Sequence, residues 1–246
     1  MTIPRLIRYS LAAVFVAAAS VAQATNGYSP TGFGSTNKGL AGAGVALPQD
    51  ALAGATNPAG MVHVGNRFDL GIALFAPDRG FTADDNAAAV PPPPSVPAGT
   101  YESRNDIFLI PHIGWNRQLD DNSSIGVLLG ANGGMNTEYG TDIWRNFNNP
   151  AGTASSPTGV DFAQLFVGMP YALRLNERHA IGVMPIVAVQ GFKAEGLEPF
   201  QGLSVAPNKV TNNGYDYSWG YGLRIGWMGE LTPRLTAGVS AQSRLY

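Results

Sequence analysis

Seven stretches of the chain alternate apolar residues with polar or small ones at a period of two. In 179–190, for example, Ile181, Val183 and Val187 fall on one face, and Met184 and Ala188 fall on the other. Such a period places successive side chains on opposite faces of a β-strand. The pattern predicts strands over 67–75, 106–117, 124–132, 161–175, 179–190, 215–228 and 234–244.

The connections between these strands are alternately short and long. Short polar turns are expected at 119–123, 176–178 and 229–233, and long segments rich in Gly, Pro and Asn at 76–105, 133–159 and 191–214. The first long segment contains the run Pro91–Pro94, which lacks amide donors and therefore belongs outside a sheet. Short turns at one end and long loops at the other are typical of transmembrane β-barrels.

Aromatic residues lie near both ends of the stretch 215–228. Tyr217 and Trp219 are close to one end and Trp227 is close to the other, as in the interfacial girdles of a membrane barrel. A soluble β-sandwich also shows alternation and turns, but it does not account for the aromatic ends or the regular change of loop length. We therefore predict an all-β fold, an antiparallel transmembrane β-barrel.

The first 24 residues have the pattern of a secretory signal peptide. Arg5 and Arg8 precede a short apolar stretch, 11–19, and Ala22-Gln23-Ala24 provides a small-residue cleavage site. An N-terminal membrane anchor is the alternative, but the apolar stretch is too short to span a bilayer. We expect cleavage after residue 24, and hence an exported protein.

Composition and charge narrow the class of protein. The chain has no cysteine, so an exported form has no disulfide framework. Without Arg5 and Arg8, 13 of the 15 Lys and Arg residues remain against 17 Asp and Glu, which makes nucleic acid an unexpected partner. A mean hydropathy close to zero suits a barrel with an apolar outer face and a more polar interior.

An odd number of strands is unusual for a membrane barrel. Bacterial single-chain barrels have even numbers of strands, and an open sheet would leave unpaired edges in lipid. The chain ends at 243–246, in or just past a predicted strand. We interpret it as a fragment or a truncated product, with an incomplete set of strands over 65–246.

Several motifs resemble one family of membrane proteins. Residues 37–44, Thr56–Met61 and the strand motifs 111–115, 136–139 and 222–227 are similar to the FadL/TodX family of outer-membrane transporters of long-chain fatty acids and aromatic hydrocarbons. The sharpest element is the glycine-rich segment that ends in Asn57-Pro58-Ala59. The resemblance implies a fourteen-stranded barrel of the cell outer membrane, acting as a monomer, of which the strands here are the first half.

The resemblance also assigns a role to the residues that precede the strands. Residues 25–64 show no sustained period, and in the family the corresponding segment folds back into the lumen as a hatch. We therefore expect a plug over 25–64. Its end is marked by Asn57, Pro58, Ala59 and Gly60, where proline fixes the backbone angle and asparagine caps locally.

The inward positions of the predicted strands are mostly apolar. A hydrophilic porin would carry charged rings there, whereas a hydrophobic ligand needs an apolar pocket with a few polar groups. Packing against the plug would explain the same side chains, and both explanations stay open. The candidate lumen residues are Phe108, Ile110, His112, Phe162, Phe166, Met184 and Ile186.

Three arginines also fall on inward positions. Arg174, Arg224 and Arg244 would either hold a fatty carboxylate or, as we expect, pair with plug acids such as Asp50.

Glycine-rich sequence at the end of the third predicted strand suggests a bulge. In the family a kink at this place opens the barrel wall for lateral exit, and the matching residues here are Gly130, Asn132, Gly133 and Gly134. Glycine tolerates the unusual dihedrals of a bulge. An ordinary strand end that runs into a loop is the alternative reading of the same residues.

The sequence does not suggest an enzyme. His63, His112 and His179 lie far apart without metal-ligand spacing, and no catalytic residue, metal or cofactor is predicted. The predicted function is passive uptake of a hydrophobic small molecule, with outer-membrane lipid as the other partner. A general porin, a loop-mediated adhesin and, less favoured, an outer-membrane hydrolase remain the alternatives.

Overall fold

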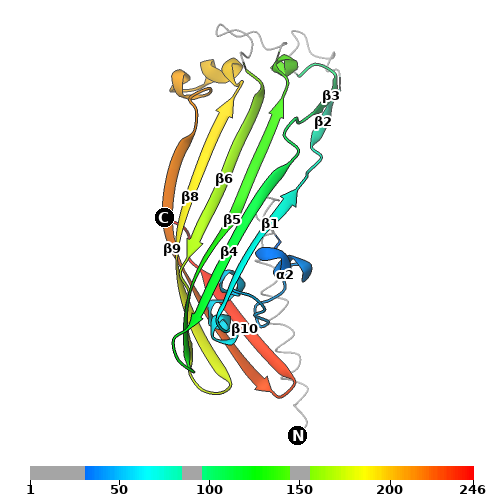
Figure 1. The fold of residues 1–246 in the computed structure, drawn as a ribbon. Coiled ribbons are helices and arrows are strands. Elements are labelled where there is room, and N and C mark those ends of the chain that lie inside the picture. Colours follow the sequence, from blue (N-terminus) through cyan, green and yellow to red (C-terminus); the bar gives the residue numbers. More distant parts are fainter. Residues whose placement is uncertain (1–30, 85–95, 145–155) are drawn as a thin grey trace, which may run out of the picture.

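One curved antiparallel sheet forms the wall of the protein. A computed structural model describes residues 31–84, 96–144 and 156–246. Seven of its eight strands follow one path, β1-β4-β5-β6-β8-β9-β10, and the short β7 pairs with β5 and β8 (Figure 1). The bounds are β1 Arg67–Phe75, β4 Phe108–Gln118, β5 Ser123–Tyr139, β6 Thr158–Gly168, β7 Tyr171–Arg174, β8 His179–Glu195, β9 Asp216–Thr232 and β10 Leu235–Gln242.

Short turns lie at one end of the sheet and long connections at the other (Figure 1). The turns join β4 to β5, β7 to β8 and β9 to β10. The long connections carry a separate two-stranded sheet and short 3-10 helices. Their bounds are β2 Gly80–Ala83, β3 Gly99–Glu102, η3 Thr141–Trp144, η4 Glu198–Leu203 and η5 Pro207–Lys209. The predicted all-β antiparallel fold is thus confirmed.

Several predicted strands differ in extent from those of the structure. β6 begins at Thr158 rather than at 161, and β9 runs to Thr232 through most of the expected turn at 229–233. β5 continues to Tyr139, although 133–159 was expected to be a loop, because an extra residue at Asn132 shifts the register against β6 and reverses the alternation beyond it. β8 likewise extends beyond the predicted end at residue 190 to Glu195. A single inserted residue is enough to hide the continuation of a strand from a period-of-two pattern.

The stretch predicted as one strand over 161–175 is broken into β6 and β7 at Met169-Pro170. Proline has no amide N–H to donate to a neighbouring strand. The Pro170 carbonyl still accepts a bond from Gly126 N (2.9 Å), and Met169 N donates to Pro185 O (3.0 Å). The wall therefore stays hydrogen-bonded across the break.

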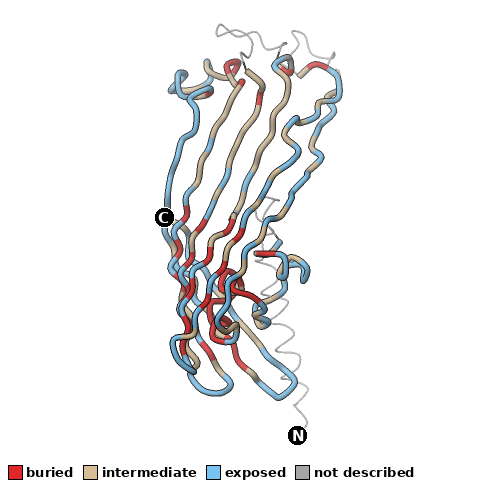
Figure 2. Tube along the Cα trace, in the orientation of Figure 1, coloured by how far each residue is buried: buried red, intermediate tan, exposed pale blue. Residues whose placement is uncertain are grey.

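The two faces of the wall differ as the alternation predicts. Outward side chains of β1, such as Leu70 and Ile72, are about two-thirds exposed, and Trp219 on β9 is 74% exposed. Inward side chains such as Phe166 and Met184 are buried. The buried residues gather in the half of the sheet nearer the short turns (Figure 2).

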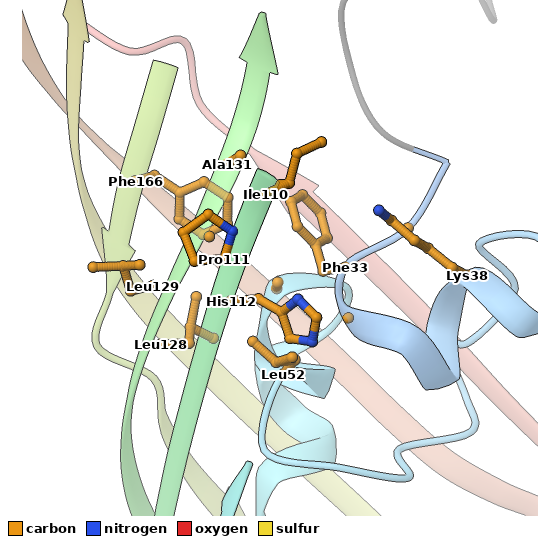
Figure 3. A pocket seen from close by; sticks show the side chains of 14 residues that line it. Phe33, Lys38, Leu52, Ile110, Pro111, His112, Leu128, Leu129, Ala131 and Phe166 are labelled. Carbon is orange, nitrogen blue, oxygen red and sulfur yellow. The ribbon is translucent and has the colours of Figure 1, made fainter. Parts of the chain in front are cut away.

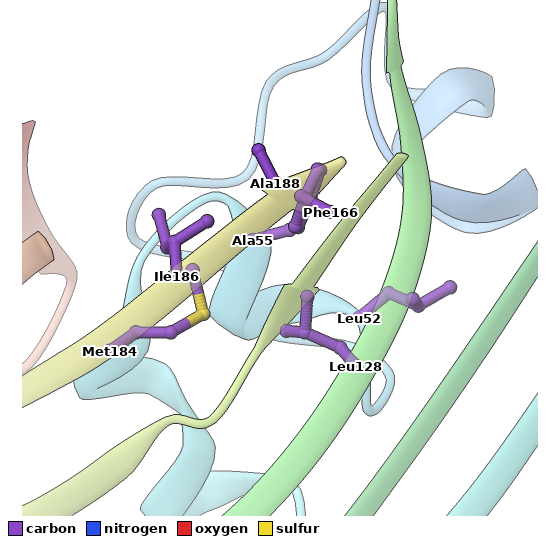
Figure 4. Packing of buried hydrophobic residues seen from close by; sticks show 7 residues of the cluster. All are labelled: Leu52, Ala55, Leu128, Phe166, Met184, Ile186 and Ala188. Atoms are coloured by element: carbon purple, nitrogen blue, oxygen red, sulfur yellow. The ribbon is translucent and has the colours of Figure 1, made fainter. Parts of the chain in front are cut away.

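Residues 31–64, here called the N-terminal segment, lie against the inner face of that half of the wall (Figure 1). The segment contains α2 Gly34–Gly39, η1 Ala53–Ala55 and η2 Pro58–His63. Two apolar clusters join it to the wall. One consists of Leu52, Ala55, Leu128, Phe166, Met184, Ile186 and Ala188 (Figure 4), and the other of Ala59, Met61, Val62, Ala172, Ala180 and Met228.

No helix within the described ranges is long and apolar enough to cross a membrane. The expected signal peptide, residues 25–30 and the proline run 91–94 lie outside the described residues.

Candidate functional site

Glycines on the inner face let the N-terminal segment approach the wall backbone. A methyl group at Gly114 would lie 2.8 Å from the Ala51 carbonyl carbon. A methyl group at Gly182 would collide with the backbone at Pro58 and Ala59. Real Cβ atoms do not come this close, so a larger residue at either position would displace the segment.

Asn57 is the main polar contact between η2 and the wall. Its buried side chain accepts a hydrogen bond from Ala59 N (3.1 Å), which caps η2. Its amide nitrogen donates to Val45 O within the segment (2.7 Å) and to Trp227 O on β9 (3.0 Å). One side chain thus fixes the helix start, a neighbouring turn of the segment and a wall strand.

A second set of polar contacts holds the segment near the short turns. Asp69 on β1 accepts from Ala51 N (2.9 Å) and is paired with Arg67 (2.6 Å), which also donates to Gln49 O (2.9 Å). Asn116 on β4, almost fully buried, donates to Met61 O at 3.0 Å. These wall side chains satisfy backbone groups of the segment that would otherwise lie unpaired.

His63, at the end of η2, is coupled to a wall arginine. Partial burial and the nearby positive charge of Arg174 lower the pKa of the His63 imidazole below its usual value, since both disfavour the charged form. Arg174 itself donates to Val62 O (3.2 Å) and to Asp121 O (3.1 Å).

An apolar pocket lies between the N-terminal segment and strands β4, β5 and β6 (Figure 3). Its cavity volume is about 20 Å³, room for little more than one water molecule, so a larger ligand enters only when the lining side chains or the N-terminal segment move. Phe33 and Phe166 meet edge to face across it, with 5.2 Å between ring centroids. Its other lining side chains include Leu52, Ile110, His112 and Leu128.

The pocket reaches a place where the wall strands separate. The β4–β5 ladder runs from Gln118–Ser124 to His112–Gly130, and no further pair follows among the described residues. Beyond it, β4 stays paired with β1, and β5, after its register shift, stays paired with β6. The pocket lining includes both rims of this gap, with Ile110 and Pro111 on β4 and Gly130 and Ala131 on β5.

Solved structures of a FadL homologue and of TodX share this architecture. A FadL homologue from Pseudomonas aeruginosa matches with a TM-score of 0.61 at 14% identity, over 89% of this chain and 53% of its own. The toluene transporter TodX of Pseudomonas putida matches with a TM-score of 0.55 at 17% identity, over 87% and 52%. A TodX deltaS2S3 mutant, a monoaromatic hydrocarbon channel, matches with a TM-score of 0.56 at 17% identity, over 77% and 49%.

The chain has the fold of the FadL and TodX channels. It spans about half the length of each of these structures. No protein-family model and no curated protein sequence matches the chain. The resemblance first noted in the motifs is thereby confirmed at the level of the fold.

Within the FadL/TodX fold, the expected lumen residues fall into three groups. Ile110, His112 and Phe166 line the apolar pocket. Met184 and Ile186 pack against Leu52 and Ala55 of the N-terminal segment (Figure 4). Phe108 and Phe162 lie outside the pocket, farther toward the long connections and only partly buried.

Phe33 and Leu52 are pocket residues that the alternation could not identify. Both lie in the aperiodic N-terminal segment, where no strand pattern indicates which side chains face the wall. Leu128 was detectable, because it occupies an inward position of the third predicted strand.

The expected pairing of inward arginines with Asp50 is wrong. The Asp50 carboxylate accepts from Leu52 N (3.0 Å) within its own turn. Arg224 instead donates from Nε to the Gln242 side chain (3.1 Å), beside a groove that also contains Thr56, and Arg244 is exposed. Short-range backbone capping satisfies the acid locally, and no distant cation is needed.

In the part of the chain that the structure describes, no group of His, Asp and Glu side chains is arranged to hold a metal ion.

Proposed function

We propose that the protein is an outer-membrane channel for passive uptake of hydrophobic compounds, either long-chain fatty acids or aromatic hydrocarbons. The observation that carries the proposal is the apolar pocket, which lies beneath the N-terminal segment and opens onto the gap between β4 and β5. The names of the similar structures, a toluene transporter and a monoaromatic hydrocarbon channel among them, support the same class of substrate.

The proposed route ends sideways in the membrane. A hydrophobic molecule captured among the long connections passes along the inner face to the pocket, and leaves through the gap beside Gly130 into lipid. Apolar lining supports this route over a general porin, because water-filled pores carry polar or charged constrictions. A bulge at Asn132 would serve the route by keeping β5 away from β4.

We also propose that residues 25–64 act as a plug that fills the lumen. The N-terminal segment is held to the wall by a limited set of side-chain bonds, including those of Asn57 and Asp69, besides apolar packing. Its displacement would open the lumen without unpairing any wall strand. The proposal also includes cleavage after residue 24, action as a monomer and the absence of any catalysed reaction.

Uptake by the full chain in proteoliposomes tests the proposal. Labelled toluene and oleate should enter, while sugars should not cause swelling. Gly130→Leu should block uptake, because a Cβ there meets only Phe33 Cδ1 at 3.9 Å and the larger side chain fills the pocket mouth. Gly202→Leu, in η4 with no atom within 4 Å of its Cβ, is the matched control and should leave uptake unchanged.

Sugar permeation without entry of toluene or oleate would instead indicate a porin. Binding of cells or matrix by the long connections, with neither kind of permeation, would indicate an adhesin.

A further inference from the structure

The gap between β4 and β5 is closed again at its far end. Arg104 N donates to Glu138 O (2.8 Å), and the Asn105 side chain donates to the Asn136 side chain (2.8 Å). Glu138 N also donates to Ser103 Oγ at 3.1 Å. The gap is therefore a bounded opening, here called the wall window, with the pair His112–Gly130 at one end and this polar cluster at the other.

Arg79 connects the two rims of the wall window at the polar cluster. It follows β1, and its guanidinium donates to the backbone carbonyl of Asn105 on one rim and to that of Asn136 on the other. Its own carbonyl accepts from Ser103 N (2.8 Å). One side chain thus joins three segments that are distant in sequence.

The same guanidinium covers an apolar residue of the rim. Its central carbon lies 5.2 Å from the ring centroid of Phe108, within the range of a cation–π contact. The Phe108 ring in turn lies 6.2 Å from that of Phe75. Arg79 Nε is buried and has no hydrogen-bond partner in the described part of the chain, so the guanidinium is not fully satisfied in this position.

These contacts differ in kind from the ladders on either side of the window. β4 is bonded to β1 over nine residue pairs and β5 to β6 over eleven, so neither rim separates from its own neighbour without the loss of many bonds. The polar cluster depends largely on side chains, and above all on one. It can therefore open while both ladders stay intact.

We propose that Arg79 is the latch of the wall window and sets the size of the hydrophobic molecule that leaves through it. Small molecules pass with the latch closed, and bulky ones pass only when the guanidinium releases one of the two rims. This proposal rests on the lateral exit proposed above.

A reducible bridge across the window tests the latch directly. The chain has no cysteine, so Asn105→Cys/Asn136→Cys introduces the only two thiols, at positions whose side chains are in contact. A short bis-methanethiosulfonate reagent then joins the rims. We expect the bridge to lower entry of a bulky solute such as a pyrene-labelled fatty acid by about tenfold, a factor worth about 1.4 kcal/mol, and to leave toluene entry unchanged. Reduction should restore entry.

Arg79→Ala supplies the opposite perturbation. It should raise entry of the bulky solute relative to toluene, whereas Arg104→Ala, an exposed arginine that joins the cluster through its backbone, should not. If Arg79→Ala fails to fold, the bridged protein still tests whether the window has to open for the bulky solute.

The outcomes separate the latch from the channel. Bulky-solute entry that is equal before and after bridging, with toluene entry intact, would overturn the latch while the channel stands. Failure of the unbridged protein to admit either solute would overturn the proposed function itself.

Discussion

Replacement of Asn57 by alanine should release η2 from the wall. The change removes three hydrogen bonds of a buried side chain, to Ala59 N, Val45 O and Trp227 O. Only the bond to Trp227 O joins the segment to the wall, and the other two hold the conformation in which the segment docks. At about 1 kcal/mol for each bond, the docked state loses about 3 kcal/mol relative to a released segment in which all three bonds are broken, which corresponds to about a hundredfold larger population of that released state.

Hydrogen exchange of the purified protein measures this population. The amides of Gly60 and Val64 donate to Asn57 O and Met61 O at the two ends of η2. They should exchange about a hundredfold faster in Asn57→Ala, while wall amides of β8 and β9 should keep their protection. Asn57→Asp should be at least as disruptive, because it keeps the cap acceptor but places a carboxylate against two carbonyl oxygens.

The exposed Asn208, in η5, provides the control substitution. Asn208→Ala should leave exchange of η2 unchanged. Unaltered exchange of η2 in Asn57→Ala, or equal acceleration of wall and η2 amides, would refute the view that Asn57 docks the segment to an independently stable wall.

Three further predictions concern the same docking. Gly182→Ala should displace η2 and make the segment sensitive to protease, because its Cβ collides with the backbone at Pro58, and Gly202→Ala should not. Asp69→Ala should weaken docking by about 1–3 kcal/mol in urea titrations, since it leaves Ala51 N unpaired and Arg67 without its carboxylate. The lowered pKa of His63 means that the released segment binds the proton more readily. Docking should therefore be complete at neutral pH and weaken as pH falls below about 6.5, as judged by protease sensitivity, and His63→Gln should remove that pH dependence.

The strands of the wall could be predicted because the two faces of each strand have different surroundings, so that one face is apolar. β1 was predicted with the bounds that the structure shows, Arg67–Phe75, since its alternation is uninterrupted. The prediction lost accuracy where the backbone departs from a regular ladder. The bulge at Asn132 concealed the second half of β5, and Pro170 split a continuous apolar pattern into two strands.

The candidate site was only partly predictable, because only its residues on regular strands carry a periodic pattern. Ile110, His112 and Phe166 belong to regular strands, so their period identified them as inward. Phe33 and Leu52 reach the pocket through tertiary packing of an aperiodic segment. Arg79 was missed as well, because its partners Asn105 and Asn136 are distant in sequence and accept through backbone carbonyls, which no side-chain pattern reveals.

The proposed uptake requires that a hydrophobic molecule occupy the pocket beside the wall window. Anomalous diffraction from crystals of the protein soaked with bromobenzene or a brominated fatty acid tests it most directly. We expect a bromine peak among Phe33, Leu52 and Phe166, and loss of that peak in Gly130→Leu. Bromine found only on the outer, exposed face of the strands, or a pocket peak that persists in Gly130→Leu, would contradict it.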